Sequence, residues 1–134
     1  MNKIEHLGIA VNNIEASAKI YEKLLGSACY KIEEVASEGV KTAFYQIGES
    51  KIELLEATNE ASPIAKFIAK KGPGIHHIAF DVTDIHAEIK RLQEEGFELI
   101  NLEPKHGADN KLIAFLHPKS TDGILVELCQ ERTN

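Results

Sequence analysis

The chain has 134 residues, 43% of them hydrophobic, and this length suits one domain that buries its own core. Its 15 basic and 21 acidic residues give a formal net charge of −6, which argues against nucleic acid or an anionic membrane surface as partner. No secretory signal is recognisable and no apolar run approaches the roughly 20 residues that cross a bilayer, so we expect a cytoplasmic protein. Cys29 and Cys129 lack metal-binding spacing and are expected to stay reduced.

The first half of the chain predicts a strand, a helix and three more strands. Apolar alternation predicts the first strand at about 3–11. Asn12 or Asn13 can cap the helix that follows, and Gly26 is a natural residue to end it. Three further alternating segments are expected to be strands, at about 28–36, 40–47 and 50–56.

A short helical linker and a second copy of this order follow. Ser62 and Pro63 are expected to begin the linker helix, at about 62–71. Alternation then predicts a strand at about 75–82, after which Thr83 can cap a helix that ends at Gly96. The last three expected strands lie near 97–102, 111–117 and 123–130.

The two halves are similar in sequence as well as in element order. His6 matches His77 at a spacing of 71 residues, and Glu53 matches Glu127 at a spacing of 74. The repeats span about 3–57 and 74–130, as an old duplication would leave them. We therefore expect an α+β fold in which two βαβββ modules form one curved, eight-stranded mixed sheet, with helices outside and a cleft within.

One His and one Glu from each half are expected to face away from the large apolar side chains. Side chains alternate along a strand, so His6 shares a face with the small residues Gly8 and Ala10, which would leave room for a ligand. Glu53 and Glu127 each stand between two apolar residues, where an unpaired buried charge would be costly.

Together, these four residues are predicted to form a metal site of two imidazoles and two carboxylates. Such ligands suit divalent first-row metals, and cobalt, manganese, zinc and nickel all remain open. Taken singly, each residue also has a structural interpretation. A strand His is usually a satisfied side chain, and a strand Glu often faces solvent.

Several segments resemble the vicinal oxygen chelate superfamily, and within it the methylmalonyl-CoA epimerases. The resemblance covers nearly the whole chain and predicts a single vicinal oxygen chelate domain over 1–134. It rests on segments that begin at the residues His6, Lys51, Gly74, Phe115 and Gly123 and read HLGIAV, KIELLE, GIHHIAFDV, FLHPKS and GILVEL.

The resemblance implies roles for individual residues. His6, Glu53, His77 and Glu127 fall on the family's metal-binding pattern, and Glu127 also holds the place of a catalytic base. Glu53 is a weaker candidate for the base on the opposite face. Where some members carry a second base, this chain has Thr42, which leaves that base unassigned.

The implied reaction interconverts (R)- and (S)-methylmalonyl-CoA. One divalent metal ion would stabilise the enolate formed when the C2 proton is removed. Lys119, Ser120 and His117 are candidates for contacts with the coenzyme A thioester, and Lys105 and Lys111 add nearby positive charge. The family also implies a homodimer.

Two other functions remain open. A glyoxalase I (lactoylglutathione lyase) uses the same fold and proton chemistry, and Glu53 suits it slightly better, since many epimerases carry Gln there. A non-catalytic small-molecule-binding protein of the same superfamily is the alternative outside enzymes, although such proteins often lose part of the metal set.

Overall fold

The computed structural model describes residues 1–132, and these form eight strands and three α-helices in the predicted order. The strands belong to one sheet, in the order β2-β3-β4-β1-β5-β8-β7-β6, with parallel and antiparallel pairs. The predicted α+β class is therefore confirmed. The chain divides into two compact units, Leu7–His76 and a second made of Met1–His6 with His77–Asn134. Each unit is described by itself below.

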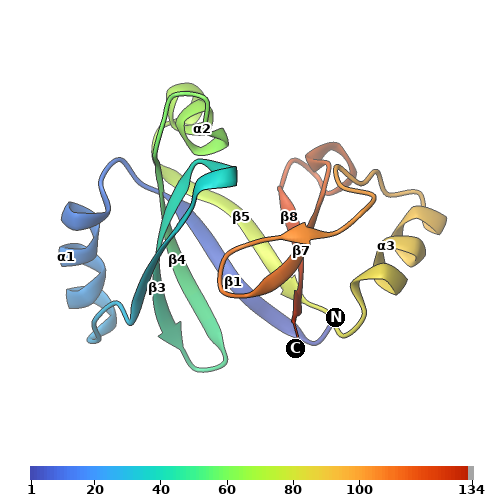
Figure 1. Ribbon diagram of the computed structural model, residues 1–134, viewed down its shortest axis with the longest axis horizontal. Coiled ribbons are helices and arrows are strands. Elements are labelled where there is room, and N and C mark those ends of the chain that lie inside the picture. The colour runs from blue at the N-terminus through green and yellow to red at the C-terminus, as the bar shows by residue number, and fades with distance from the viewer. Residues whose placement is uncertain (133–134) are drawn as a thin grey trace. The chain divides into compact units, whose positions relative to one another are not determined.

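The unit Leu7–His76 contains the second half of β1 (Lys3–Ala10), followed by α1 (Ile14–Leu25) and the antiparallel strands of the first repeat. Those strands are β2 (Lys31–Val35), β3 (Val40–Ile47) and β4 (Ser50–Ala57), with a 3-10 turn at Ala36–Glu38. The helix α2 (Pro63–Lys71) packs against β4, and α1 packs against β3 and β4 (Figure 1). Separate apolar clusters lie under these two helices.

The sequence signals for α1 and α2 act as predicted. The Oδ1 atom of Asn13 accepts a hydrogen bond from the amide of Ala16 at 2.8 Å, so Asn13 rather than Asn12 is the cap. Gly26 ends α1 at φ 72°, a left-handed conformation that glycine adopts without a Cβ clash. Ser62 caps α2 by accepting from the amide of Ile64 at 3.2 Å.

The face of β1 that was predicted to leave room for a ligand is covered at Ala10. Ala10 is completely buried in a cluster with Leu55 and Ile64, the latter from α2. Its small side chain therefore makes room for a helix, and the expectation that Ala10 leaves space for a ligand is wrong.

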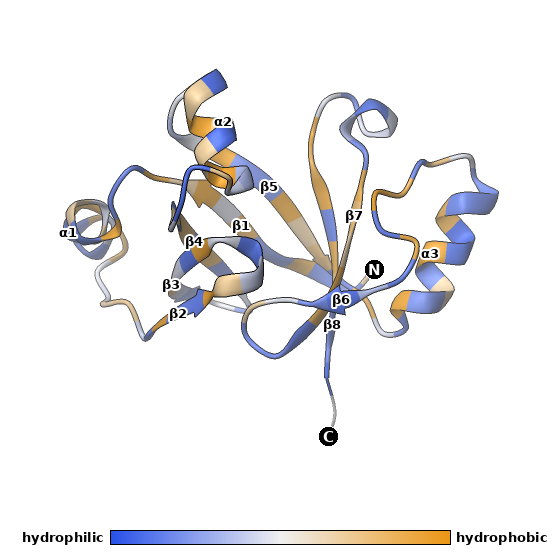
Figure 2. Ribbon diagram, turned by 45° about the horizontal axis from the view of Figure 1, so that its top comes forward, coloured by the Kyte–Doolittle hydropathy of each residue, from blue (hydrophilic) through white to orange (hydrophobic). Residues whose placement is uncertain are grey.

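The second unit is built around the parallel pair β5 (Gly74–Asp81) and β8 (Val126–Glu131). Next to β8 lies antiparallel β7 (Lys111–Leu116), followed by the short strand β6 (Lys105–His106). The helix α3 (Ile85–Glu94) packs against β7 and β8. In Figure 2 its apolar positions interrupt an otherwise hydrophilic helix, and its buried residues are Ile85, Ile89 and Leu92.

Two expectations for this unit are wrong in detail. Asp84, not Thr83, caps α3, because its carboxylate accepts from the amide of Ala87 at 3.1 Å. The segment 97–102 is not a strand beyond an isolated bridge from Leu99 to Leu116. Backbone hydrogen bonds still join this segment to the end of β7, from the amide of Ile100 to the carbonyl of Phe115 at 2.7 Å and from the amide of His117 to the carbonyl of Glu98 at 2.8 Å. The amide of Phe115 itself donates to the side chain of Asn101 at 2.9 Å, so regular pairing does not continue past this point.

Among the described residues, no helix is long and apolar enough to span a membrane.

Candidate metal centre

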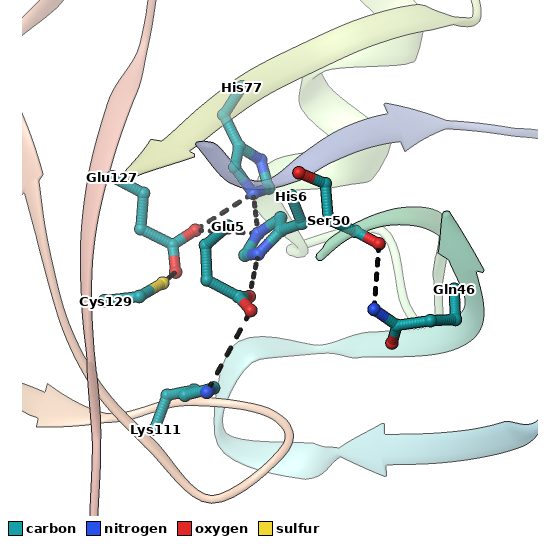
Figure 3. Close-up of polar contacts among 8 residues, drawn as sticks. All are labelled: Glu5, His6, Gln46, Ser50, His77, Lys111, Glu127 and Cys129. Atoms are coloured by element: carbon teal, nitrogen blue, oxygen red, sulfur yellow. Dashed lines mark hydrogen bonds and ion pairs between the residues drawn. The ribbon is translucent and has the colours of Figure 1, made fainter. Parts of the chain in front are cut away.

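Three predicted ligands converge within one unit, from β1, β5 and β8. The Nε2 atoms of His6 and His77 lie 2.9 Å apart. The Oε1 atom of Glu127 is 2.9 Å from Nε2 of His77 and 3.5 Å from Nε2 of His6 (Figure 3). The structure thus brings the N-terminal imidazole to the same point as two groups from the second repeat.

Strand register explains how β5 and β8 present these groups on one face. In the parallel pair, Ala79 lies opposite Glu127, so His77, two residues before Ala79, shares that face. The fully buried Ala79 takes little space there. On the other side Phe115 of β7 lies opposite Glu127, and its ring meets the His77 ring edge-on at 5.9 Å between centroids. These contacts restrict the rotation of the His77 ring.

All three side chains are buried, with 4–5% of each residue exposed. Burial acts to raise the pKa of Glu127, but His6 and His77, through charge and hydrogen bonding, outweigh it and hold the pKa well below its ordinary value. Glu127 is therefore an ionised carboxylate at neutral pH, as a ligand for a cation must be.

These residues fit a divalent metal. Two imidazole nitrogens and a carboxylate oxygen all approach one another within hydrogen-bonding range, and their ligand atoms lie within 4.8 Å of each other. A proton on one of these three atoms can be shared with only one of the other two at a time. A divalent cation can be bound by all three atoms at once. Nitrogen and oxygen ligands of this kind suit zinc and its first-row neighbours.

Two further buried residues, Glu5 and Cys129, contact this cluster directly, and neither was predicted to lie there. Oε1 of Glu5 lies 2.8 Å from Nδ1 of His6, and Oε2 of Glu5 lies 4.0 Å from Nζ of Lys111. The thiol of Cys129 donates to Oε2 of Glu127 at 3.0 Å. Lys111 was expected beside the coenzyme tail, but its residue is only 9% exposed and its ammonium faces Glu5.

Comparison with known proteins identifies the family. The model of the Glyoxalase/Bleomycin resistance protein/Dioxygenase superfamily matches residues 5–115. The chain belongs to this superfamily. It is 41% identical over 130 residues to the mitochondrial methylmalonyl-CoA epimerase of Dictyostelium discoideum, covering 96% of this chain and 78% of that protein.

Two further comparisons point the same way within the superfamily. An ethylmalonyl-CoA/methylmalonyl-CoA epimerase of Cereibacter sphaeroides is 42% identical over 132 residues, with 97% of this chain and 98% of that protein covered. The structure of a methylmalonyl-CoA epimerase variant from Streptomyces coelicolor, in complex with 2-nitronate-propionyl-CoA, matches with a TM-score of 0.95 at 34% identity. That match covers 99% of this chain and 96% of the other. The resemblance to this epimerase family is confirmed.

The fourth ligand expected in a superfamily member of this kind, Glu53, lies on β4 in the other unit. It is buried and pairs with Phe44 of β3 in the strand register. Thr42 lies on β3 of the same unit, also buried, opposite Leu55 of β4. The ligand role of Glu53 and the identity of the second base stay predictions.

The three expected substrate residues lie at the 3-10 turn Pro118–Ser120, in the same unit as the histidine pair. Nδ1 of His117 accepts from the amide of Lys119 at 3.1 Å, and Oγ of Ser120 accepts from the amide of Glu98 at 2.9 Å. The ammonium of Lys119 pairs with Glu98 at 2.8 Å, and this contact lowers the pKa of Glu98. The turn thus has a structural role of its own, while Lys119 and Ser120 also line a surface pocket of about 440 Å³.

Proposed function

We propose that this chain is a metal-dependent epimerase that interconverts (R)- and (S)-methylmalonyl-CoA by removing and returning the proton at C2. The observation that carries the proposal is the convergence of His6, His77 and Glu127 in a chain whose relatives are methylmalonyl-CoA epimerases. The Streptomyces coelicolor relative holds an acyl-CoA analogue in its structure, which supports a coenzyme A thioester as the substrate class.

The residues proposed to hold the metal are His6, His77, Glu127 and, from the first repeat, Glu53. When bound, a divalent ion would supply positive charge that stabilises the enolate oxygen of the substrate. The donor set is compatible with cobalt, manganese, zinc or nickel.

Glu127 is proposed as the base on one face of the substrate. Its contacts with His6 and His77 keep it ionised, so it is ready to accept a proton at neutral pH. The same contacts make it a weak base, and catalysis therefore requires that charge stabilisation acidify the C2 proton. Glu53 is proposed as the base on the opposite face, by analogy with its position in the repeat.

The coenzyme A portion is proposed to lie near the turn of His117, Lys119 and Ser120. Lys119 is the cation of this group, and most of its side chain is exposed even though it pairs with Glu98. An anionic phosphate can compete with the Glu98 carboxylate for that ammonium. We also propose a homodimer, as the family implies, and a cytoplasmic location, as expected from the sequence.

A glyoxalase I remains the second candidate, because Glu53 provides a carboxylate where many epimerases carry an amide. Both reactions begin with removal of a proton beside a carbonyl, so metal binding alone does not separate them. The substrate does.

The deciding experiment offers both substrates to the same protein. Metal-stripped protein is titrated with cobalt, manganese, zinc and nickel, and each form is incubated in deuterated water with methylmalonyl-CoA or with the glutathione adduct of methylglyoxal. Loss of the C2 proton signal of methylmalonyl-CoA, dependent on metal and removed by chelator, is the expected result. Turnover of the glutathione adduct alone would establish glyoxalase activity instead. If neither substrate is converted, both proposed activities are excluded.

A further inference from the structure

A buried carboxylate lies directly behind the metal-facing side of His6. Only 3% of Glu5 is exposed, and its Oε1 atom is 2.8 Å from Nδ1 of His6, on the side of the ring opposite to the Nε2 atom that meets His77 (Figure 3). A carboxylate in this place is costly to bury unless other groups compensate its charge.

Lys111 at the start of β7 supplies that compensation. Its Nζ atom lies 4.0 Å from Oε2 of Glu5, and the lysine side chain is itself largely buried. The two oxygens of Glu5 are therefore used differently: Oε1 meets the imidazole and Oε2 meets the ammonium.

This arrangement argues against a second metal site beside the first. Glu5, His6 and Cys129 also place ligand atoms within 4.8 Å of one another. However, the Lys111 ammonium already provides a cation at Glu5, and Nδ1 of His6 is engaged by the carboxylate. A metal ion there would have to displace both contacts.

We propose instead that Glu5 is a positioning residue for His6. Its carboxylate accepts the Nδ1 proton, so the Nε2 atom, which faces His77 and Glu127, is the nitrogen left to bind a metal. The ammonium of Lys111, 4.0 Å from Oε2, compensates the charge of the carboxylate and helps to hold it in place. The inference rests on the proposed function in one respect only, that His6 is a metal ligand.

The proposal predicts a loss of metal affinity without a loss of fold. Removal of a hydrogen-bond partner behind a metal-ligating histidine typically weakens metal binding by about 10–100-fold. We expect a weakening of this order for Glu5→Ala and a smaller one for Glu5→Gln, whose amide oxygen can still accept from Nδ1. Glu5→Asp should recover part of the affinity, because it restores the charge at a slightly greater distance.

The tautomer of His6 can be measured directly in the metal-free protein. Nitrogen chemical shifts of ¹⁵N-labelled histidine distinguish a protonated Nδ1 from a protonated Nε2. The native protein should show His6 protonated at Nδ1, and the Glu5 variants should show a mixture. Because this readout needs neither metal nor substrate, it tests the role of Glu5 even where the proposed enzymatic function fails.

Two control variants separate positioning from stability. Glu88→Gln makes the same chemical change at a carboxylate of α3 that is bonded to Arg91, and it should leave both the His6 tautomer and the metal affinity unchanged. The double variant Glu5→Gln with Lys111→Met removes both buried charges, so it should recover thermal stability relative to Glu5→Gln while metal binding stays weak.

Chelator competition with zinc or cobalt gives the affinities, and thermal unfolding reports the fold. A native tautomer in folded Glu5→Ala and Glu5→Gln, together with metal affinity within about twofold of the native value, would overturn the proposal. Should Glu5→Ala not fold, the same comparison between Glu5→Gln and Glu5→Asp decides it.

Discussion

Replacing Glu127 by Gln is the sharpest test of the proposed chemistry. The substitution keeps the shape of a residue of which only 5% is exposed, but it removes the negative charge that lies 2.9 Å from His77 and 3.5 Å from His6. It also removes the group proposed to accept the C2 proton. The fold should survive, because β8 keeps its backbone pairs with β5 and β7.

The expected effect is large. A positioned base contributes about 10²–10⁴-fold to the rate, which corresponds to about 2.7–5.4 kcal/mol in the activation free energy. Loss of an anionic ligand should weaken metal binding as well, so the variant is assayed at metal concentrations that titration shows to be saturating. Under these conditions, an exchange rate that is still below the native rate reflects the loss of proton transfer by Glu127.

The assay follows the C2 proton of methylmalonyl-CoA in deuterated water by NMR. Glu131→Gln is the matched control, since it makes the same change at the exposed end of the same strand. Exchange by metal-saturated Glu127→Gln within about threefold of the native rate would exclude Glu127 as the base, because so small a change lies well below that of a lost general base.

Three further predictions concern the scaffold. Ile85→Ala opens a cavity at a completely buried position of α3 and should lower the free energy of unfolding by about 2–5 kcal/mol in denaturant titration; a loss below about 1 kcal/mol would contradict the packing described. Asn13→Ala should cost about 1 kcal/mol by the same measurement while Asn12→Ala costs much less, and equal effects would remove Asn13 as the cap. The hydrogen bond from Arg91 lowers the pKa of Glu88, so this contact stabilises the fold above the ordinary carboxyl pKa and is lost as the pH falls through the lowered value. Thermal melts from pH 7 to 2 should therefore show a small stability deficit of Glu88→Gln at neutral pH that closes at the acid end, and a pH-independent difference would contradict this.

The order of elements was predictable because it depends on local patterns. Helix signals at Asn13, Gly26 and Ser62 act within a few residues of themselves, and strand alternation is equally local. The segment expected to be a strand at 97–102 is joined to β7 by an isolated bridge at Leu99 and a backbone hydrogen bond from Ile100 to Phe115, but regular pairing stops where the amide of Phe115 donates to the side chain of Asn101. Nothing in the alternation of residues 97–102 reveals that contact, because its two partners lie well apart in the sequence.

For the site, the internal repeat predicted that the two histidines and Glu127 share a face, and the structure brings these three side chains together, while their role as ligands stays a prediction. The strand alternation that predicts the position of His6 also places its neighbour Glu5 on the opposite face, so Glu5 was not predicted to contact the site. Strict alternation assigns neighbouring residues to opposite faces, yet Glu5 and His6 are both buried and bonded to each other. The residue that could have indicated Glu5 is Lys111, a charged residue at the beginning of an apolar strand. Burial of its ammonium requires a nearby anion.

His6 and Glu127 meet although most of the chain separates them. Contacts of such long sequence separation require closure of a long loop before they contribute any stability. During synthesis His6 and its neighbour Glu5 emerge early, whereas Glu127 is absent until β8 has been made. The proposed metal site is therefore complete only when β8 has paired with β5 beside the N-terminal strand.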